Sequence, residues 1–288
     1  MKAYLEIVRK ILETGVRKQN RTGIDTLAVP GMMFEHDMSA GFPLVTTKSV
    51  PFRLVASELE FFIKGITDKE WLRANDNHIW DEWCSPQKVP YGRDEETKKR
   101  MAAERDLGPV YGFQWRNFGR RYAGFDSPPA GEGVDQLKSL VEKIRTDPND
   151  RRLIVSAWNP VDLPRMALPP CHFCFQVTVI GDRLNLLWNQ RSVDVALGLP
   201  FNIAGYGLLL HLIARETGFK EGKLVGFLSD THVYVNHVDG LREQLTREPY
   251  GLPAVRTEPF RGLFDWRWQE TIVENYSHHP RIPFEVAV

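Results

Sequence analysis

Short apolar runs dominate the second half of the chain. Each is rich in β-branched and aromatic residues and is bounded by Gly, Asp or Pro, which is typical of strands. The four runs are Leu153–Trp158, Phe173–Ile180, Leu184–Trp188 and Leu224–Leu228. We therefore expect strands to dominate this half of the chain.

Apolar residues at helical spacing predict helices around these strands. The expected helices are one at the start with Tyr4, Val8, Ile11 and Leu12, then Leu54–Gly65, one marked by Leu137, Leu140, Val141 and Ile144, then Ile203–Arg215 and Val233–Leu245. Ile203–Arg215 is the most apolar, so we expect it to be buried on most sides. A polar loop at Asn20–Gly23 follows the first helix. Because no repeat, low-complexity tract or clear linker is present, the sequence predicts one α+β domain over residues 1–288.

The balance of charges limits the kinds of partner. The 288 residues include 37 Lys and Arg against 37 Asp and Glu, which gives zero formal net charge. Non-specific nucleic-acid binders depend on a broad positive field, and this chain lacks one. We therefore expect no DNA partner, although a local basic cluster can still hold a small anion.

The segment Gly92–Asp106 differs from the rest of the chain. Ten of its fifteen residues are charged, and Pro86 and Pro90 precede it. Such a stretch suits a solvated surface better than a core. We predict a surface insertion over residues 86–106.

Cysteine usage and apolar runs indicate the compartment. Cys84, Cys171 and Cys174 cannot all pair as disulfides, and a chain this long needs no disulfide scaffold, so we expect a reducing environment. Charged residues interrupt Met1–Gly15, which therefore lacks the apolar block of a signal peptide. No apolar run approaches the ~18 residues of a membrane span. These features predict a soluble cytoplasmic protein without membrane partners.

Several familiar motifs are incomplete. Cys171 and Cys174 have CxxC spacing, but a structural zinc site needs a second pair, and a redox pair opens a helix rather than a strand. His232 and His237 lie five positions apart on a predicted helix, so they face different ways and we predict no metal site. GxGxxG is absent, and Gly218–Gly222 is too short for a phosphate loop. Any hydride must therefore come from a donor other than a Rossmann-bound dinucleotide.

A stronger set of residues spans three segments, Pro169–His172, Gln190–Asp194 and Pro200–Ala204. They supply a possible thiol nucleophile at Cys171, a guanidinium at Arg191 that would favour its thiolate, and amide and carboxylate groups able to read a heterocycle. Each part has an ordinary alternative. A lone Cys entering a strand is usually a small buried hydrophobe, and Arg191 next to Ser192 is also compatible with a solvated turn.

These segments and others closely resemble the thymidylate synthase family over nearly the whole chain. The further matching stretches are Asn20–Gly23, Phe42–Lys48, Ile79–Trp83, Gly108–Gly112 and Val286–Val288. The resemblance implies an α+β fold whose mixed β-sheet is covered by helices on one face, with the sheets of two subunits packed back to back in a homodimer. It also implies methylation of dUMP to dTMP, with methylenetetrahydrofolate supplying the one-carbon unit and the hydride and leaving as dihydrofolate.

The resemblance assigns catalytic roles residue by residue. Cys171 would add to carbon 6 of uracil, which makes carbon 5 nucleophilic. Arg191 would favour the thiolate, because an ordinary thiol with a pKa near ~8.5 is mostly protonated at neutral pH. Glu58 would relay protons, Tyr111 would assist removal of the carbon 5 hydrogen, and Asp194 would lie between nucleotide and folate.

The same resemblance implies that polar and basic side chains contact dUMP. Asn202 would face the uracil edge, since its amide matches the N3 hydrogen and O4 of uracil but not the reverse pattern of cytosine. The other nucleotide contacts would be Arg21, Arg191 and Ser192 with the second subunit's Arg151 and Arg152 at the phosphate, His232 and Tyr234 at the ribose, and Gln190. Without the resemblance, Arg151 and Arg152 would be a solvated pair after a turn, and His232 an ordinary helix histidine.

The folate would contact a mainly apolar set, since flat apolar surfaces suit stacking. This set comprises Ile79, Trp80, Leu168 and Phe201, with Asp194 and Gly198. Val288 would close over the bound ligands and exclude water.

Some positions depart from the commonest family pattern, namely Ser49, Pro51, Glu60 and Asn189. Glu60 and Asn189 resemble a hydroxymethylase branch in which water captures the exocyclic methylene, so a dUMP hydroxymethylase is the alternative function. A non-catalytic nucleotide-binding or RNA-binding relative is a further alternative. Such a relative would lack Cys171 or Glu58, and both residues are present in this chain. Glu58 and Glu60 lie two positions apart on a predicted helix, so at most one of them shares a given pocket wall.

Overall fold

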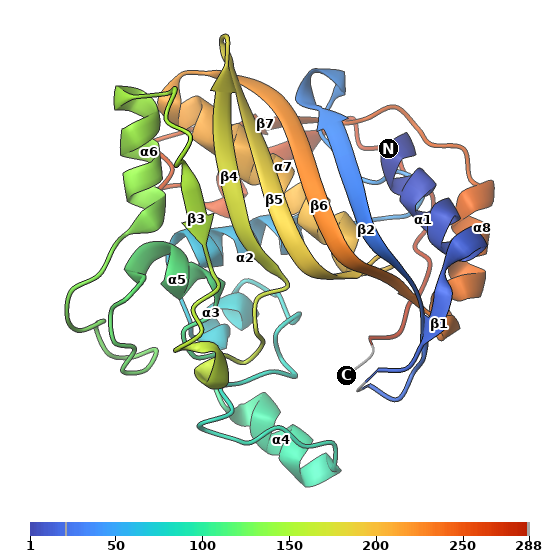
Figure 1. Ribbon diagram of the computed structural model, residues 1–288, viewed down its shortest axis with the longest axis horizontal. Coiled ribbons are helices and arrows are strands. Elements are labelled where there is room, and N and C mark those ends of the chain that lie inside the picture. Colours follow the sequence, from blue (N-terminus) through green and yellow to red (C-terminus); the bar gives the residue numbers. More distant parts are fainter. Residues whose placement is uncertain (21, 287–288) are drawn as a thin grey trace. The chain divides into compact units, whose positions relative to one another are not determined.

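The computed structural model of the chain describes residues 1–20 and 22–286, and Figure 1 shows its helices and strands. The chain forms two compact units. Unit 1 comprises Met1–Phe52, Val177–Pro259 and Gln269–Val288, and unit 2 comprises Arg53–Gln176 and Phe260–Trp268. Both units combine helices with strands, which confirms the predicted α+β class.

A mixed sheet runs through unit 1. Its strands, in spatial order, are β1 (Val16–Lys18), β2 (Thr26–Asp37), β6 (Lys220–Tyr234), β5 (Arg183–Asp194) and the end of β4 (His172–Ile180). β2 is antiparallel to β1 and to β6, whereas β5 and β6 are parallel, and Figure 1 shows β2, β6 and β5 side by side. Parallel neighbours need a crossover connection, which helix α7 (Gly198–Thr217) supplies between β5 and β6.

Successive side chains along the strands point to opposite faces of this sheet, one buried and one exposed. Phe34 of β2 and Trp188 of β5 are fully buried, with ring centroids 5.8 Å apart. Tyr206 of α7 stacks on Trp188 at 5.3 Å, so this row faces the helix. The neighbouring register pair on β2 and β6 is Met33 with Phe227, whose side chains are 57% and 42% exposed. The opposite face of the sheet therefore carries exposed apolar side chains.

Helix α7 is buried over most of its length, as the sequence predicted. It ends where Gly218 adopts a left-handed conformation with φ 80°, which glycine accepts without strain. Among the described residues no helix, α7 included, is long and apolar enough to cross a membrane. The rest of unit 1 comprises α1 (Lys2–Thr14), α8 (Val238–Thr246), the two-stranded sheet of β7 (Ala254–Thr257) and β8 (Thr271–Glu274), and the 3₁₀ turns η1 (Met38–Ala40) and η3 (Val235–His237).

Unit 2 is mainly helical. Its elements are α2 (Phe52–Ile63), α3 (Lys69–Ala74), α4 (Glu95–Ala103), α5 (Tyr111–Asn117), α6 (Gln136–Thr146), β3 (Ile154–Ser156), η2 (Leu163–Arg165) and the start of η4 (Trp268–Glu270). β3 pairs antiparallel with the first half of β4, where Val155 lies opposite Phe175. α6 begins where the Asp135 side chain accepts a hydrogen bond from the Lys138 N–H, and its apolar face is buried.

The charged segment expected to form an insertion contains helix α4. Asp94 caps its N-terminus, and most of its side chains are exposed. Met101 instead points inward and forms a small buried cluster with Cys84 and Val89. The buried Lys69 donates from Nζ to the Met101 carbonyl over 2.8 Å. The segment is thus solvated along one side and anchored along the other.

The predicted helix Val233–Leu245 is wrong over its first part. β6 continues to Tyr234, and α8 begins only at Val238. Thr231 and Val233 pair in register with β2. These long-range sheet contacts outweigh the local helical spacing, because strand formation depends mainly on neighbouring strands.

Two strands of unit 1 carry little signal in the sequence. β2 contains Pro30 and Gly31, two residues that weaken a strand pattern, and β1 is very short. β5 reaches Asp194, well beyond the predicted end at Trp188. Arg191 therefore lies on a strand and not in a solvated turn.

The packing around Gly226 predicts an effect on stability. A Cβ at this position would lie 2.4 to 2.8 Å from ring atoms of Trp188. We expect Gly226→Ala to lower the free energy of unfolding by about 2 kcal/mol, as overpacked core substitutions do. Urea denaturation measures the change, and an unchanged midpoint would contradict the packing. Gly251→Ala is the matched control, because nothing lies within 4 Å of the added Cβ, and should change stability by less than about 0.5 kcal/mol.

Candidate functional site

The residues that the sequence assigned to a site are distributed over both units. Unit 2 holds Glu58, Ile79, Trp80, Tyr111, Arg151, Arg152, Leu168 and Cys171, and unit 1 holds Gln190, Arg191, Ser192, Asp194, Gly198, Phe201, Asn202, His232 and Tyr234. Arg21 and Val288 lie outside the described residues.

Cys171 lies directly before β4 and is half-buried. Its backbone N–H donates a hydrogen bond to the Tyr111 hydroxyl oxygen over 2.8 Å. Tyr111 is the first residue of α5, so the start of that helix and the start of β4 are joined at Cys171. The fold thereby brings together two candidate residues that are 60 positions apart in the sequence. No cysteine of the described chain is in a disulfide.

The His172 ring belongs to an aromatic cluster next to Cys171. It stacks on Tyr111 with centroids 4.4 Å apart, and Tyr111 also stacks on Phe62 at 4.9 Å. Burial lowers the pKa of His172 to about 3, so its imidazole is neutral at physiological pH. A neutral ring cannot supply the positive charge that favours a thiolate. Sequence reasoning gave His172 no role, although its place after the candidate nucleophile was a signal.

Glu58 is half-buried on α2 and joins this cluster through Trp80. Its Oε1 accepts a hydrogen bond from the Trp80 indole N–H over 2.8 Å. The Trp80 ring meets Tyr111 edge-on, with centroids 6.1 Å apart. Burial raises the pKa of Glu58 to about 7, against the opposing effect of the Trp80 hydrogen bond. Glu58 therefore exchanges a proton near neutral pH, as a general acid or base must.

Glu60 is buried on the same helix and has different partners. Its carboxylate forms an ion pair with Lys64 one helical turn later. It also accepts a hydrogen bond from the Trp268 backbone N–H over 2.7 Å. This agrees with the expectation that the two carboxylates face different ways, and it gives Glu60 a structural role.

The end of β5 and the start of α7 carry the second group of candidate residues. Asp194 Oδ1 accepts from two backbone N–H groups at 3.0 and 3.2 Å, which closes the turn into α7. Gln190 Nε2 donates to Asn202 Oδ1 over 2.9 Å, so β5 holds the Asn202 side chain. Gly198 lies next to both residues, because a Cβ built at this position would lie 3.7 Å from Asn202 Oδ1 and 3.8 Å from Asp194 Cβ. Also half-buried on these two elements are Arg191, Ser192 and Phe201.

His232 and Tyr234 lie on β6 and not on a helix, which corrects their predicted placement. His232 is the register partner of Asp194, so these two candidate residues are neighbours in the sheet. His232 Nδ1 lies 3.2 Å from Asp230 Oδ1, and its ring meets Tyr234 edge-on with centroids 5.5 Å apart. Alternate residues of a strand share a face, which places His232 and Tyr234 together.

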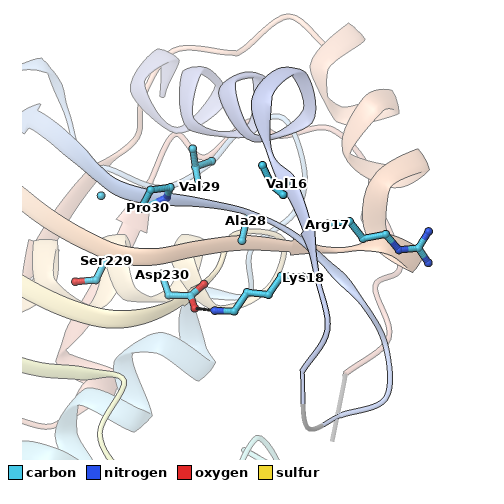
Figure 2. A pocket seen from close by; sticks show the side chains of 9 residues that line it. Val16, Arg17, Lys18, Ala28, Val29, Pro30, Ser229 and Asp230 are labelled. Carbon is cyan, nitrogen blue, oxygen red and sulfur yellow. Dashed lines mark hydrogen bonds and ion pairs between the residues drawn. The ribbon is translucent and has the colours of Figure 1, made fainter.

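A hollow of about 680 Å³ lies where β1, β2 and β6 meet. Figure 2 shows the side chains that line it and the ion pair of Lys18 with Asp230. The lining residues are Val16, Arg17, Lys18, Ala28, Val29, Pro30, Gly31, Ser229 and Asp230. Because none of the predicted site residues lines this hollow, we do not assign the nucleotide to it.

Arg151 and Arg152 follow α6 and are both exposed. Arg152 donates from Nε to Asp150 Oδ1 over 2.9 Å, and this hydrogen bond lowers the pKa of Asp150 to about 2. The two guanidiniums thus form the exposed pair expected after a turn. Their role toward a second subunit stays a prediction.

Ile79, Trp80 and Leu168 are the residues of unit 2 that the sequence assigned to folate contact. Ile79 is 37% exposed next to the buried Trp80, and Leu168 is half-buried. An exposed aliphatic side chain next to an indole suits the stacking of a flat ring system. No group of three or more His, Cys, Asp or Glu side chains in the described part of the chain is placed to hold a metal ion.

Comparisons with known proteins agree on one family. The family model described as Thymidylate synthase matches residues 2–288. Two similar proteins, both named Thymidylate synthase, come from varicella-zoster virus, one from strain Dumas and one from the Oka vaccine strain. Each is 43% identical to this chain over 286 residues, a match that covers 99% of this chain and 93% of the relative.

The raised pKa of Glu58 predicts a pH-dependent difference in stability. A carboxyl whose pKa is about 7 in the folded chain, against 4.5 ordinarily, favours folding when protonated, and this contribution is lost as the pH rises through about 7. Glu58→Gln keeps an acceptor for Trp80 but cannot ionise. We expect it to match the wild-type protein below about pH 4.5 and to be more stable by about 2 kcal/mol at about pH 8.

Urea denaturation of both proteins across this pH range measures the difference. Glu95→Gln is the control, because the Glu95 side chain is 81% exposed and its replacement should give no such trend. A pH-independent difference between Glu58→Gln and wild type would contradict the raised pKa.

Proposed function

The chain belongs to the thymidylate synthase family, which methylates dUMP to dTMP, and we propose that Cys171 is the nucleophile of this reaction. The chain is accordingly a methyltransferase that uses a folate cosubstrate, which we take to be methylenetetrahydrofolate. One observation in unit 2 supports the assignment most strongly. Trp80, Tyr111 and His172 form a continuous aromatic cluster that connects the Glu58 carboxylate to the backbone of Cys171. An acid–base group and a thiol are thus held by one packed assembly.

Cys171 activates the pyrimidine ring. Carbon 5 of uracil is a poor nucleophile until the Cys171 sulfur bonds to carbon 6 and converts the ring to an enolate. Carbon 5 then bonds to the one-carbon unit, and after carbon 5 loses its proton the bond from that unit to the folate nitrogen breaks. Transfer of a hydride from the folate completes the methyl group as the carbon–sulfur bond breaks, which gives dTMP and dihydrofolate and regenerates the thiolate. Because His172 is neutral, the positive charge that favours the thiolate is assigned to Arg191.

Glu58 and Tyr111 move protons. The carbon 5 hydrogen must leave as a proton once the one-carbon unit is attached. Glu58, with a pKa of about 7, can accept and release protons through ordered water at neutral pH. The Tyr111 hydroxyl oxygen accepts from the Cys171 N–H, and we assign to this hydroxyl the hydrogen bond that assists proton removal.

Nucleotide recognition is assigned mainly to unit 1. Asn202 reads the N3 hydrogen and O4 of uracil. The other proposed contacts are Arg21, Arg191 and Ser192 at the phosphate, His232 and Tyr234 at the ribose, and Gln190. Because Glu60 bonds to Lys64 and to the Trp268 backbone, its presence needs no hydroxymethylase explanation. Methylation is therefore favoured over the hydroxymethyl alternative.

The folate is assigned to a mainly apolar set of residues. Those residues are Ile79, Trp80, Leu168 and Phe201, with Asp194 and Gly198, and with Val288 as the residue that closes over the ligands. Apolar surface around the reacting carbons excludes water, which protects a reactive one-carbon unit from hydrolysis.

We further assign the chain to a homodimer. The exposed apolar side chains of Met33 and Phe227 lie on the sheet face opposite α7, and a second copy of that face would bury them. The exposed Arg151 and Arg152 would then complete the phosphate site of the partner subunit. The whole chain acts as one catalytic domain with residues 86–106 as a surface insertion. A cytoplasmic location suits this chemistry, because a catalytic thiol needs a reducing environment.

Replacing the nucleophile tests the assignment. A serine hydroxyl is a far weaker nucleophile than a thiolate, so Cys171→Ser should lower turnover by about a thousandfold or more while calorimetry shows dUMP affinity within about threefold of wild type. The absorbance rise of dihydrofolate and mass analysis of the product nucleotide measure turnover. Cys174→Ser, which changes the neighbouring thiol, should retain activity. Retained turnover in Cys171→Ser would exclude the nucleophile, and a hydroxymethyl product without dihydrofolate would exclude methylation.

Subunit mixing tests the shared phosphate site. Arg152→Ala and Cys171→Ser should each be nearly inactive alone. After subunit exchange, half of the dimers are mixed and each mixed dimer has one intact site, so about a quarter of wild-type activity should return. Mixing Cys171→Ser with Cys171→Ala should restore nothing. No recovery after proven exchange would place Arg152 outside the partner's site.

A further inference from the structure

A buried chain of hydrogen bonds in unit 1 leads from the core to Asn202. Trp188 Nε1 donates to Gln190 Oε1 over 3.1 Å. Gln190 Nε2 donates to Asn202 Oδ1 over 2.9 Å and to the Ser192 carbonyl over 3.0 Å. Trp188 is fully buried and Gln190 is 2% exposed, so water does not compete for these groups. The Gln190 amide is thus bonded through both its oxygen and its nitrogen.

The chemistry of the end groups fixes the orientation of both amides. An indole N–H can only donate and a backbone carbonyl can only accept. Gln190 must therefore turn its oxygen toward Trp188 and its nitrogen toward the Ser192 carbonyl. That nitrogen also faces Asn202, which must present Oδ1 to it. The direction of the Asn202 amide follows from two groups that cannot reverse their roles.

The Trp188 ring is held firmly enough to act as the fixed end. It stacks on Tyr206 with centroids 5.3 Å apart and an interplanar angle of 9°, and it packs against Phe34 at 5.8 Å. Gly226 lies beneath the ring, where an added Cβ would come within 2.4 Å of it. Because the ring fills this space, the indole N–H keeps one position.

We propose that Trp188 is a specificity-determining positioning residue, which acts through Gln190 to hold the Asn202 amide in the orientation that matches uracil. The proposal rests on the assignment of Asn202 to the pyrimidine edge. With one lone pair of Oδ1 used by Gln190, the second accepts the N3 hydrogen of uracil, and Nδ2 donates to O4. Cytosine offers an acceptor at N3 and a donor at its amino group, so it requires the reversed amide.

Loss of the indole N–H has a direct consequence for this arrangement. Gln190 Oε1 would become a buried acceptor without its donor, which destabilises the present orientation of the amide. The Ser192 carbonyl alone would then hold the Gln190 amide, which would keep Asn202 less firmly in the orientation that fits uracil. A less firmly held Asn202 amide favours uracil less over cytosine, so discrimination between the two bases should fall.

The test is the ratio of dUMP to dCMP affinity, measured by calorimetry on the full chain. Trp188→Phe keeps a flat ring against Tyr206 and removes only the N–H and part of the volume. We expect the ratio to fall about tenfold, mainly through weaker dUMP binding. Phe34→Leu loosens the packing around Trp188 but keeps the N–H, so its ratio should equal that of wild type even if its melting temperature falls.

Three results would overturn the proposal. The first is a wild-type ratio of dUMP to dCMP affinity in folded Trp188→Phe. The second is a fall of this ratio in Phe34→Leu as large as that in Trp188→Phe. If Trp188→Phe does not fold, the third is a wild-type ratio in Gln190→Met, which removes the central amide of the hydrogen-bond chain. Asn202→Asp separates this proposal from the function on which it rests. If Asn202→Asp leaves the ratio unchanged, Asn202 does not read the base, and the assigned function of that residue fails. If Asn202→Asp changes the ratio and Trp188→Phe does not, the role of Trp188 alone is wrong.

Discussion

The hydrogen bond from the Cys171 N–H to the Tyr111 hydroxyl ties the candidate nucleophile to the packed interior of unit 2. Tyr111 packs against Phe62, Trp80 and His172, so buried rings help to fix the backbone of Cys171 directly before β4. The same burial sets the protonation of the neighbouring groups. It keeps His172 neutral and raises the pKa of Glu58 to about 7. Packing and acid–base chemistry therefore have one physical cause here.

Unit 1 depends in a comparable way on the parallel pairing of β5 with β6. That pairing requires a crossover, and the crossover helix α7 carries Asn202 at its start and Tyr206 farther along. Tyr206 stacks on Trp188, while Gln190, two positions later on β5, holds Asn202. The register of the sheet also sets Asp194 beside His232. The pairing of the strands thus places the groups that we propose to recognise the nucleotide.

The sequence predicts the elements whose signal is local. Helices α1, α2, α6 and α7 and strand β4 follow from periodicity and apolar content, because each buries a face that its own residues define. β2 and the end of β6 escape prediction because they are stabilised by each other across a long stretch of chain. In the site, Cys171 and Glu58 stand out by residue type and family resemblance, whereas the Tyr111 contact with Cys171 needs the fold. Trp188 and Gln190 had a usable signal, since positions two apart on a strand share a face.

The proposed reaction depends on a covalent bond between the Cys171 sulfur and carbon 6 of the pyrimidine. A fluorine at carbon 5 cannot leave as a cation, so a 5-fluorinated dUMP should stop the reaction with that bond in place when methylenetetrahydrofolate is present. Proteolysis and fragmentation mass spectrometry then locate the nucleotide. We expect it on Cys171 and not on Cys84 or Cys174. A nucleotide on another residue, or no adduct on protein that turns over dUMP, would contradict the account.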